Sequence, residues 1–279
     1  MAHNLPFAVN CSLLFTELSI LERPAAARAA GFTAVEFWWP WPEKPAPADR
    51  EVDAFVAAVK DAGVRMVGLN FFAGDLAGPD CGVLSIPGRA AEFAENVDVA
   101  VGIGEQLGVR AFNALYGNRV DTSSASEQDE LGLQQLLSAA QAASRIGATV
   151  LLEPVSGPKP YPLRTTSDVV AVLDQVVAAG GSNVGLLFDL FHLANNGDDI
   201  DRALDLYADR IAHVQIADHP GRGEPGTGAL DLDRHLTRIQ DSGYSGYVAL
   251  EYNPTGSTTD SLAWLPRERR SARPEDLQE

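Results

Sequence analysis

The chain has 279 residues, of which 46% are hydrophobic, and a formal net charge of −17 at pH 7. This length and composition allow a large core within one domain. The charge argues against nucleic acid or an anionic membrane surface as the main partner, because both are negatively charged. The two cysteines provide neither a disulfide framework nor the thiolate spacing of a metal site. Without a signal-peptide pattern or an apolar run approaching the ~18–20 residues that span a bilayer, the sequence predicts a cytoplasmic protein.

Eight short apolar or β-branched runs predict strands, and Ala-rich segments with helical periodicity separate them. The runs are residues 7–12, 34–38, 64–70, 110–115, 149–154, 184–190, 211–218 and 247–252. Six helical segments each stop at a glycine, which often supplies the positive φ needed after a helix. These segments are 19–30, 51–62, 90–107, 127–146, 166–179 and 230–242. The alternation predicts an α/β fold, a single-domain (β/α)8 TIM barrel over residues 1–266.

An open doubly wound sheet is the alternative fold. It is disfavoured because the first strand–helix turn lacks a G-x-G-x-x-G motif and because polar residues follow many strands rather than one switch point. The tail, residues 267–279, is charged and lacks apolar anchors, so we predict that it is disordered.

Four of the predicted strands carry a polar residue near their ends, namely Glu153, Asp189, Gln215 and Glu251. Polar groups are costly on buried strands unless something satisfies them, and a barrel brings the C-terminal ends of its strands to one mouth. Three carboxylates and one amide oxygen without cysteine favour Mg²⁺ or Mn²⁺ over a structural zinc. The alternative is that each residue is an isolated polar group bonded to backbone or water.

Further candidates lie beside these four residues. His213 shares a strand face with Gln215, and we expect it to hydrogen-bond a ligand carboxylate rather than to bind metal. His192 follows Asp189 closely enough to reach a substrate oxygen. The Gly-rich loop 219–228 allows close backbone approach, and its Arg222 suits an anionic substrate.

Asparagines and tryptophans near other strand ends leave two interpretations open. Asn10, Asn70 and Asn113 either line a pocket or cap loop backbone. Trp38, Trp39 and Trp41 form either a hydrophobic pocket wall or a subunit contact in a homo-oligomer.

Several motifs occur in chain order: Val35-Glu-Phe37, Ala73-Gly-Asp75, Ile86-Pro-Gly-Arg89, Phe112-Asn113, Leu152-Glu-Pro154, Asp189-Leu-Phe-His192, His213-Val-Gln-Ile-Ala-Asp218, Arg222-Gly-Glu-Pro-Gly226 and Leu250-Glu-Tyr252. From about Phe7 to Pro266 the chain resembles the hydroxypyruvate isomerase family, within the xylose isomerase-like TIM-barrel superfamily. Two segments depart from the family pattern: residues 155–161, and Asn253, where the family pattern has Lys or Gln.

The resemblance implies roles for particular residues. It implies a divalent metal on Glu153, Asp189, Gln215 and Glu251, with Glu153 and Glu251 also acting as the acid–base pair. It implies substrate contacts from His192, Arg222 and Glu224, and we add Asn70 and Asn113 to the expected substrate-binding set.

The expected reaction interconverts hydroxypyruvate and tartronate semialdehyde through a cis-enediolate, with Arg222 holding the substrate carboxylate. A ketose 3-epimerase or a related sugar isomerase with the same ligands is the first alternative. A barrel-type endonuclease acting on abasic DNA would need more histidine ligands and a basic surface, which five histidines and a charge of −17 disfavour. A non-catalytic sugar-acid binding protein is the alternative from another class.

Overall fold

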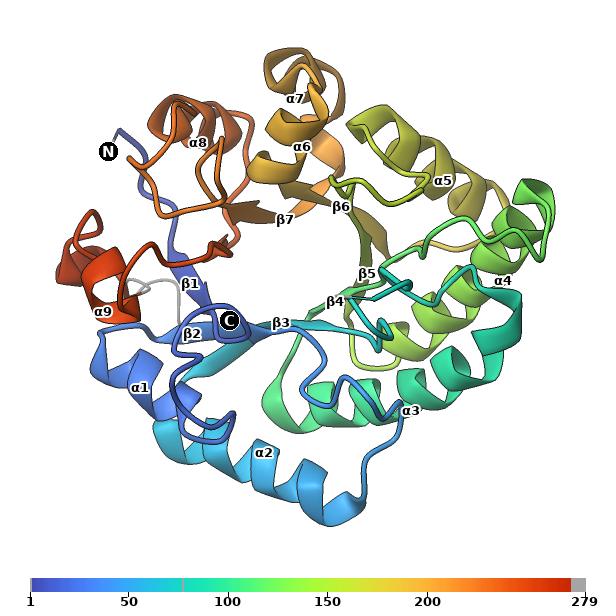
Figure 1. Ribbon diagram of the computed structural model, residues 1–279, viewed down its shortest axis with the longest axis horizontal. Helices are drawn as coiled ribbons and strands as arrows, with labels where there is room; N and C mark the ends of the chain where they lie inside the picture. Colours follow the sequence, from blue (N-terminus) through green and yellow to red (C-terminus); the bar gives the residue numbers. More distant parts are fainter. Residues whose placement is uncertain (1, 77, 272–279) are drawn as a thin grey trace.

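Eight parallel strands pair in chain order and close into a barrel, because β8 pairs with both β7 and β1 (Figure 1). The computed structural model describes residues 2–76 and 78–271. The strands are β1 (Phe7–Asn10), β2 (Ala34–Phe37), β3 (Arg65–Asn70), β4 (Ala111–Asn113), β5 (Thr149–Leu152), β6 (Val184–Asp189), β7 (Ile211–Ile216) and β8 (Val248–Leu250). The predicted TIM barrel is confirmed. The strands begin within one residue of their predicted starts and end up to two residues earlier.

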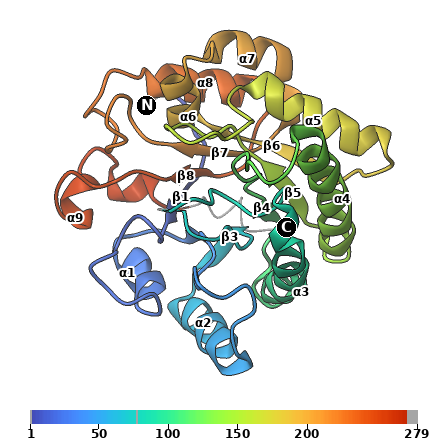
Figure 2. The same cartoon turned by 45° about the vertical axis from the view of Figure 1, so that its right-hand side comes forward.

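Helices surround the barrel on its outer side, as Figures 1 and 2 show from two directions. They are α1 (Arg23–Ala29), α2 (Asp49–Ala62), α3 (Ala90–Leu107), α4 (Ala125–Ser144), α5 (Thr166–Ala178), α6 (Leu190–Asn196), α7 (Ile200–Tyr207), α8 (Leu232–Asp241) and α9 (Thr258–Ser261). The described part of the chain also forms three short 3-10 helices, which span Pro87–Arg89, Ala208–Arg210 and Arg267–Arg269. Among the described residues, no helix is long and apolar enough to cross a bilayer.

Local chemistry explains where the helices begin and end. Each of the six glycines predicted to stop a helix has a positive φ, from 64° at Gly63 to 104° at Gly31. The helix expected from residue 19 starts later, at Arg23, where Pro24 occupies a first-turn position that needs no backbone N–H. Ser124 begins α4 in a capping box with Glu127.

The strands are buried on both faces, as expected for a parallel barrel covered by helices. Phe7, Met66, Phe112, Leu152 and Phe188 are all fully buried. Because this apolar packing holds the strands, the residues that follow the strand ends are fixed in position at the mouth of the barrel.

The tail differs in part from the expectation of disorder. Arg267–Arg269 form a 3-10 turn, and Arg270 donates hydrogen bonds to the carbonyl oxygens of Ala30, Leu262 and Leu265. A guanidinium carries five N–H donors and can satisfy several carbonyls at once, so these arginines anchor the chain without apolar side chains. Residues 272–279 lie outside the described residues.

Candidate active site

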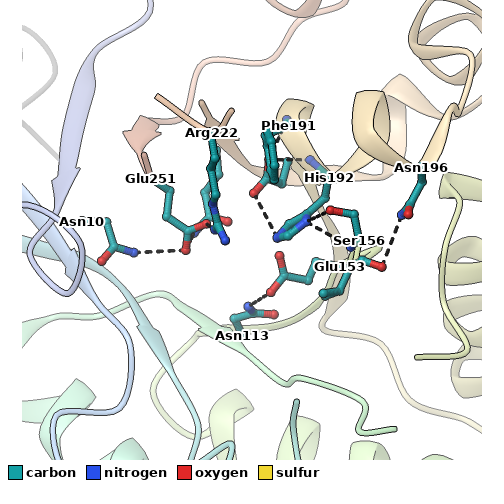
Figure 3. A network of polar contacts seen from close by, with 12 residues as sticks. Asn10, Asn113, Glu153, Ser156, Phe191, His192, Asn196, Arg222 and Glu251 are labelled. Atoms are coloured by element: carbon teal, nitrogen blue, oxygen red, sulfur yellow. Dashed lines mark hydrogen bonds and ion pairs between the residues drawn. The ribbon is translucent and has the colours of Figure 1, made fainter. Parts of the chain in front are cut away.

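The four polar residues predicted at the strand ends are all buried, with exposed fractions of 5% for Glu153, 1% for Asp189, 2% for Gln215 and 4% for Glu251. Glu153 and Glu251 directly follow β5 and β8, Asp189 ends β6, and Gln215 lies opposite Asp189 in β7. Figure 3 shows the carboxylates of Glu153 and Glu251 pointing into the same space.

Glu251 accepts hydrogen bonds on both carboxylate oxygens. Its Oε1 accepts from Trp38 Nε1 at 2.7 Å and from the amide nitrogens of Asn10 and Gln215, each at 3.3 Å. Its Oε2 accepts from Arg222 Nη2 at 2.7 Å (Figure 3). Donors from three strand ends and one loop therefore fix the orientation of this carboxylate.

Glu153 has fewer partners and lies beside His192. Its Oε1 accepts a hydrogen bond from Asn113 Nδ2 at 2.6 Å. The backbone N–H of Ser156 donates to His192 Nδ1 at 3.0 Å, so Nε2 is the ring nitrogen that carries the proton. His192 Nε2 lies 3.8 Å from Asp189 Oδ2. Burial lowers the pKa of His192 to about 4, although Asp189 acts in the opposite direction, so the imidazole is neutral at pH 7.

Burial and neighbouring carboxylates raise the pKa of both glutamates of the site. Burial and then the charge of Asp189 raise the pKa of Glu153 to about 8, while the hydrogen bond from Asn113 acts the other way. Burial also raises the pKa of Glu251, Arg222 opposes the increase, and Asp189 and Glu153 add to it. Several buried acids therefore lie together with little positive charge nearby. A bound cation would stabilise their ionised forms.

Two buried oxygens are suited to such a cation. Among the described residues, Asp189 Oδ2 and Gln215 Oε1 have no hydrogen-bond partner. Asp189 Oδ1 is already used by the backbone N–H groups of Phe191 and His192 at the start of α6. One ligand atom from each of Glu153, Asp189 and His192 lies within 4.8 Å of the others. This oxygen-rich donor set fits a divalent metal.

Glu36 is a part of the site to which the sequence analysis assigned no role. It lies in β2, is 3% exposed, and accepts hydrogen bonds from Asn10 Nδ2 and Gln215 Nε2, both at 2.8 Å. His213 Nε2 lies 2.7 Å from Glu36 Oε2. His213 therefore contacts a carboxylate, but that carboxylate is Glu36 rather than a predicted metal ligand. The signal was present, since Glu36 is a charged residue within an apolar strand.

The Gly-rich loop after β7 is held by Asp218, whose carboxylate accepts backbone N–H bonds from His219, Gly226, Gly228 and Leu230. Burial acts to raise the pKa of Asp218, but these four bonds outweigh it and the pKa is lowered. Arg222 has a φ of 60° in this loop, and its guanidinium carbon lies 5.3 Å from the centre of the Phe191 ring.

A cavity of about 210 Å³ opens above Glu153 and Glu251. Trp38, Asn70, His192 and Arg222 line it, together with Lys159 from the loop after β5. This size suits a small metabolite, because pockets for drug-sized ligands are about 300–1,000 Å³.

Some predicted residues lie elsewhere. Glu224 is not among the residues that line the cavity, and its carboxylate binds the backbone N–H and hydroxyl of Thr255. Trp39 donates to the carbonyl oxygen of Lys44 at 2.7 Å and packs edge-on against Trp41 at a ring distance of 5.1 Å. Of the three tryptophans, Trp38 therefore belongs to the pocket wall.

The sequence profile described as Xylose isomerase-like TIM barrel matches residues 24–268. The chain belongs to this xylose isomerase-like family. It is 52% identical to a "Putative hydroxypyruvate isomerase" of Streptomyces coelicolor, over 96% of this chain and 98% of the relative. It is 30% identical to the hydroxypyruvate isomerase of Escherichia coli and 30% identical to a 2-oxo-tetronate isomerase of Haemophilus influenzae, in each case over 94% of this chain and 98% of the relative. The family member described here is therefore an isomerase.

Solved structures agree with the barrel fold. A structure titled AP endonuclease, family 2, from Brucella melitensis superposes with a TM-score of 0.83 and 31% identity, covering 93% of this chain and 97% of that chain. A 3-keto-D-glucoside 4-epimerase from E. coli superposes with a TM-score of 0.75 at 22% identity, covering 94% and 98% respectively, which supports the fold alone.

Proposed function

We propose that the protein is a metal-dependent sugar-acid isomerase that interconverts hydroxypyruvate and tartronate semialdehyde. The observation that carries the proposal is the pair of buried carboxyl groups, Glu153 and Glu251, facing one small cavity beside the partnerless oxygens of Asp189 and Gln215. The names of the full-length relatives support the same reaction class.

In this reaction a proton leaves C3 of hydroxypyruvate, a cis-enediolate forms across C2 and C3, and a proton returns to C2. One carboxylate removes the carbon-bound proton, and the same or the opposite carboxylate returns one, while a hydroxyl proton moves between the two substrate oxygens. No external oxidant or reductant is required. Burial moves the pKa of Glu153 to about 8, near the range in which a group can both accept and donate protons at neutral pH.

The remaining site residues would bind and orient the substrate. His192, neutral and with Nε2–H directed toward the site, would donate a hydrogen bond to a substrate oxygen. Arg222 holds Glu251 through Nη2, and its buried Nε has no partner among the described residues, so Nε remains for a substrate oxygen. Mg²⁺ or Mn²⁺ held by Glu153, Asp189, Gln215 and Glu251 would stabilise the negative charge that develops on the substrate oxygens.

A four-carbon substrate is the second candidate. A 2-oxo-tetronate isomerase matches this chain over nearly its whole length at the same identity as the E. coli hydroxypyruvate isomerase. The two substrates share the α-keto acid and the neighbouring hydroxyl group, so the same acid–base pair would serve both.

An endonuclease and a non-catalytic binding protein have less support. An endonuclease would bring a polyanion to a chain with a net charge of −17. A non-catalytic binding protein would have no need for both buried glutamates. We expect a small sugar acid, rather than nucleic acid, to occupy the cavity.

Proton NMR of the metal-loaded protein in D₂O tests the proposal, with hydroxypyruvate and 2-oxo-tetronate as separate substrates. The expected result is isomerisation with deuterium at the reacting carbon, reduced about 100- to 10,000-fold in Glu153→Gln and in Glu251→Gln. Glu130→Gln, on the exposed side of α4, is the matched control and should keep full activity. Turnover of ketoses but of neither acid would contradict the proposed substrate class.

A further inference from the structure

Lys159 is the cation of the cavity that no site carboxylate neutralises. It lies in the loop after β5 and lines the cavity with Glu153, His192 and Arg222. Its Nζ donates to the carbonyl oxygen of Leu76 at 2.8 Å, and among the described residues no carboxylate pairs with it. An ammonium group has three N–H donors, so two remain for a ligand.

Arg222 is less suited to bind an incoming carboxylate. Its Nη2 pairs with Glu251 at 2.7 Å, and its guanidinium stacks on Phe191. The negative charges of Glu251, Asp189 and Glu153 all act to raise the pKa of Arg222, against the effect of burial, so its positive charge is shared among three acids. A substrate carboxylate placed beside Arg222 would face these acids as well.

The loop presents Lys159 in a fixed position. Pro158 and Pro160 flank it, and a following proline restricts a residue to extended conformations. The backbone N–H of Arg119 donates to the carbonyl oxygen of Pro160 at 2.9 Å, and that of Tyr161 donates to the carbonyl oxygen of Lys159 at 2.8 Å. This ordering lowers the entropy that the lysine loses when it binds a ligand.

Cys81 lines the same cavity. Burial raises the pKa of its thiol to about 11, and the charges of Glu153 and Lys159 act on that pKa in opposite directions. The acid and the ammonium group therefore both lie close enough to Cys81 to influence it. A small molecule that carries both a reacting carbon and an anionic group suits a cavity lined by Glu153 and Lys159.

We propose that Lys159 binds the carboxylate of the substrate and thereby selects sugar acids over neutral sugars, while Arg222 orients Glu251. The identity of the bound acid rests on the proposed function. The existence of an anion site at Lys159 does not depend on it.

The first test is equilibrium binding, which needs no turnover. Glycerate, the non-reactive reduced form of hydroxypyruvate, is titrated into the Mn²⁺-loaded protein by calorimetry. Lys159→Met should weaken glycerate binding about 10- to 100-fold, the usual effect of losing a charged hydrogen bond, and Lys159→Arg should restore most of it. Lys60→Met, on the exposed surface of α2, is the matched control. Equal binding by wild type and Lys159→Met, or no binding by wild type, would overturn the inference.

The second test compares hydroxypyruvate with dihydroxyacetone, in which a neutral CH₂OH replaces the carboxylate. Lys159→Met should raise KM for hydroxypyruvate with little change in kcat, and should leave kcat/KM for dihydroxyacetone unchanged. Equal losses on both substrates would indicate a structural role for Lys159 and overturn the inference. If wild type binds glycerate but isomerises no acid, the proposed function fails, and the calorimetry alone decides the role of Lys159.

Discussion

The indole nitrogen of Trp38 lies 2.7 Å from Oε1 of Glu251, although 213 residues separate them in the chain. Trp38 follows β2, Glu251 follows β8, and β1 lies between these strands in the closed barrel. Indole N–H is a donor only, so the contact orients one particular carboxylate oxygen, and Trp38 also lines the cavity. Trp38 is thus a positioning residue for Glu251.

Trp38→Phe keeps an aromatic ring but removes the donor to Glu251. We expect kcat for the isomerisation to fall about tenfold, because one hydrogen bond to a charged group is typically worth about 1.5–3 kcal/mol and three other donors remain. Trp39→Phe is the matched control: it loses a bond to a backbone carbonyl and should cost about 1 kcal/mol of unfolding free energy, with kcat unchanged. Similar kcat values for the two variants would contradict the role of Trp38.

Glu36→Gln should weaken metal binding without removing a proposed ligand. Glu36 accepts a hydrogen bond from Gln215 Nε2, and this bond keeps Gln215 Oε1 directed away from Glu36. Loss of such supporting partners typically costs about 10- to 100-fold in metal affinity. Calorimetric titration with Mn²⁺ measures the effect. The control is His235→Gln, which changes a buried residue on α8. This variant should bind Mn²⁺ as wild type does.

Metal binding should release protons. The pKa of Glu153 is raised to about 8, so this group carries a proton at pH 7 in the metal-free protein and must lose it to act as a ligand. Affinity for Mn²⁺ should therefore increase from pH 6 to pH 8, by up to about tenfold per pH unit. Titration in buffers with different ionisation enthalpies counts the protons. A buffer-independent enthalpy would argue against Glu153 as a ligand.

The stability of the metal-free protein should decrease as the pH rises. Since the folded-state pKa of Glu153, about 8, lies above the ordinary value of 4.5, the folded state holds this proton more tightly than the unfolded state. The resulting stabilisation is complete below about pH 4.5 and is lost as the pH passes about 8. Thermal unfolding between pH 6 and pH 9 should show a falling Tm. Glu153→Gln should flatten that slope, and an unchanged slope in this variant would refute the assignment.

The sequence was sufficient to predict the fold and the strand ends that carry most of the candidate site residues, because the signals were local. Glycines marked the helix ends, and Glu153 and Asp189 stood out as charged residues closing apolar runs. The two helices between β6 and β7 were not predicted from the sequence. Both are short: α6, which ends at Gly197, has only seven residues, and α7 has eight. Glu36 was passed over because its partners come from β1 and β7, and register across a barrel is not visible in the sequence.

Loop residues were harder to predict for a physical reason. Ser156 and Lys159 lie in a segment without periodicity, and their roles depend on contacts with His192 and Leu76 that only the closed barrel creates. Glu224 stays a predicted substrate contact, and nothing in the sequence indicated that its carboxylate binds Thr255 in the neighbouring loop.

The pairing of β1 with β8 determines when the site can form during synthesis and refolding of the chain. Asn10 ends β1 and Glu251 directly follows β8, and the two side chains hydrogen-bond to one another, so the site cannot assemble until Glu251 has been synthesised. A nascent or truncated chain, even one with most of its helices formed, would lack Glu251 in its place. Recovery of activity after refolding should therefore track closure of the barrel rather than formation of secondary structure.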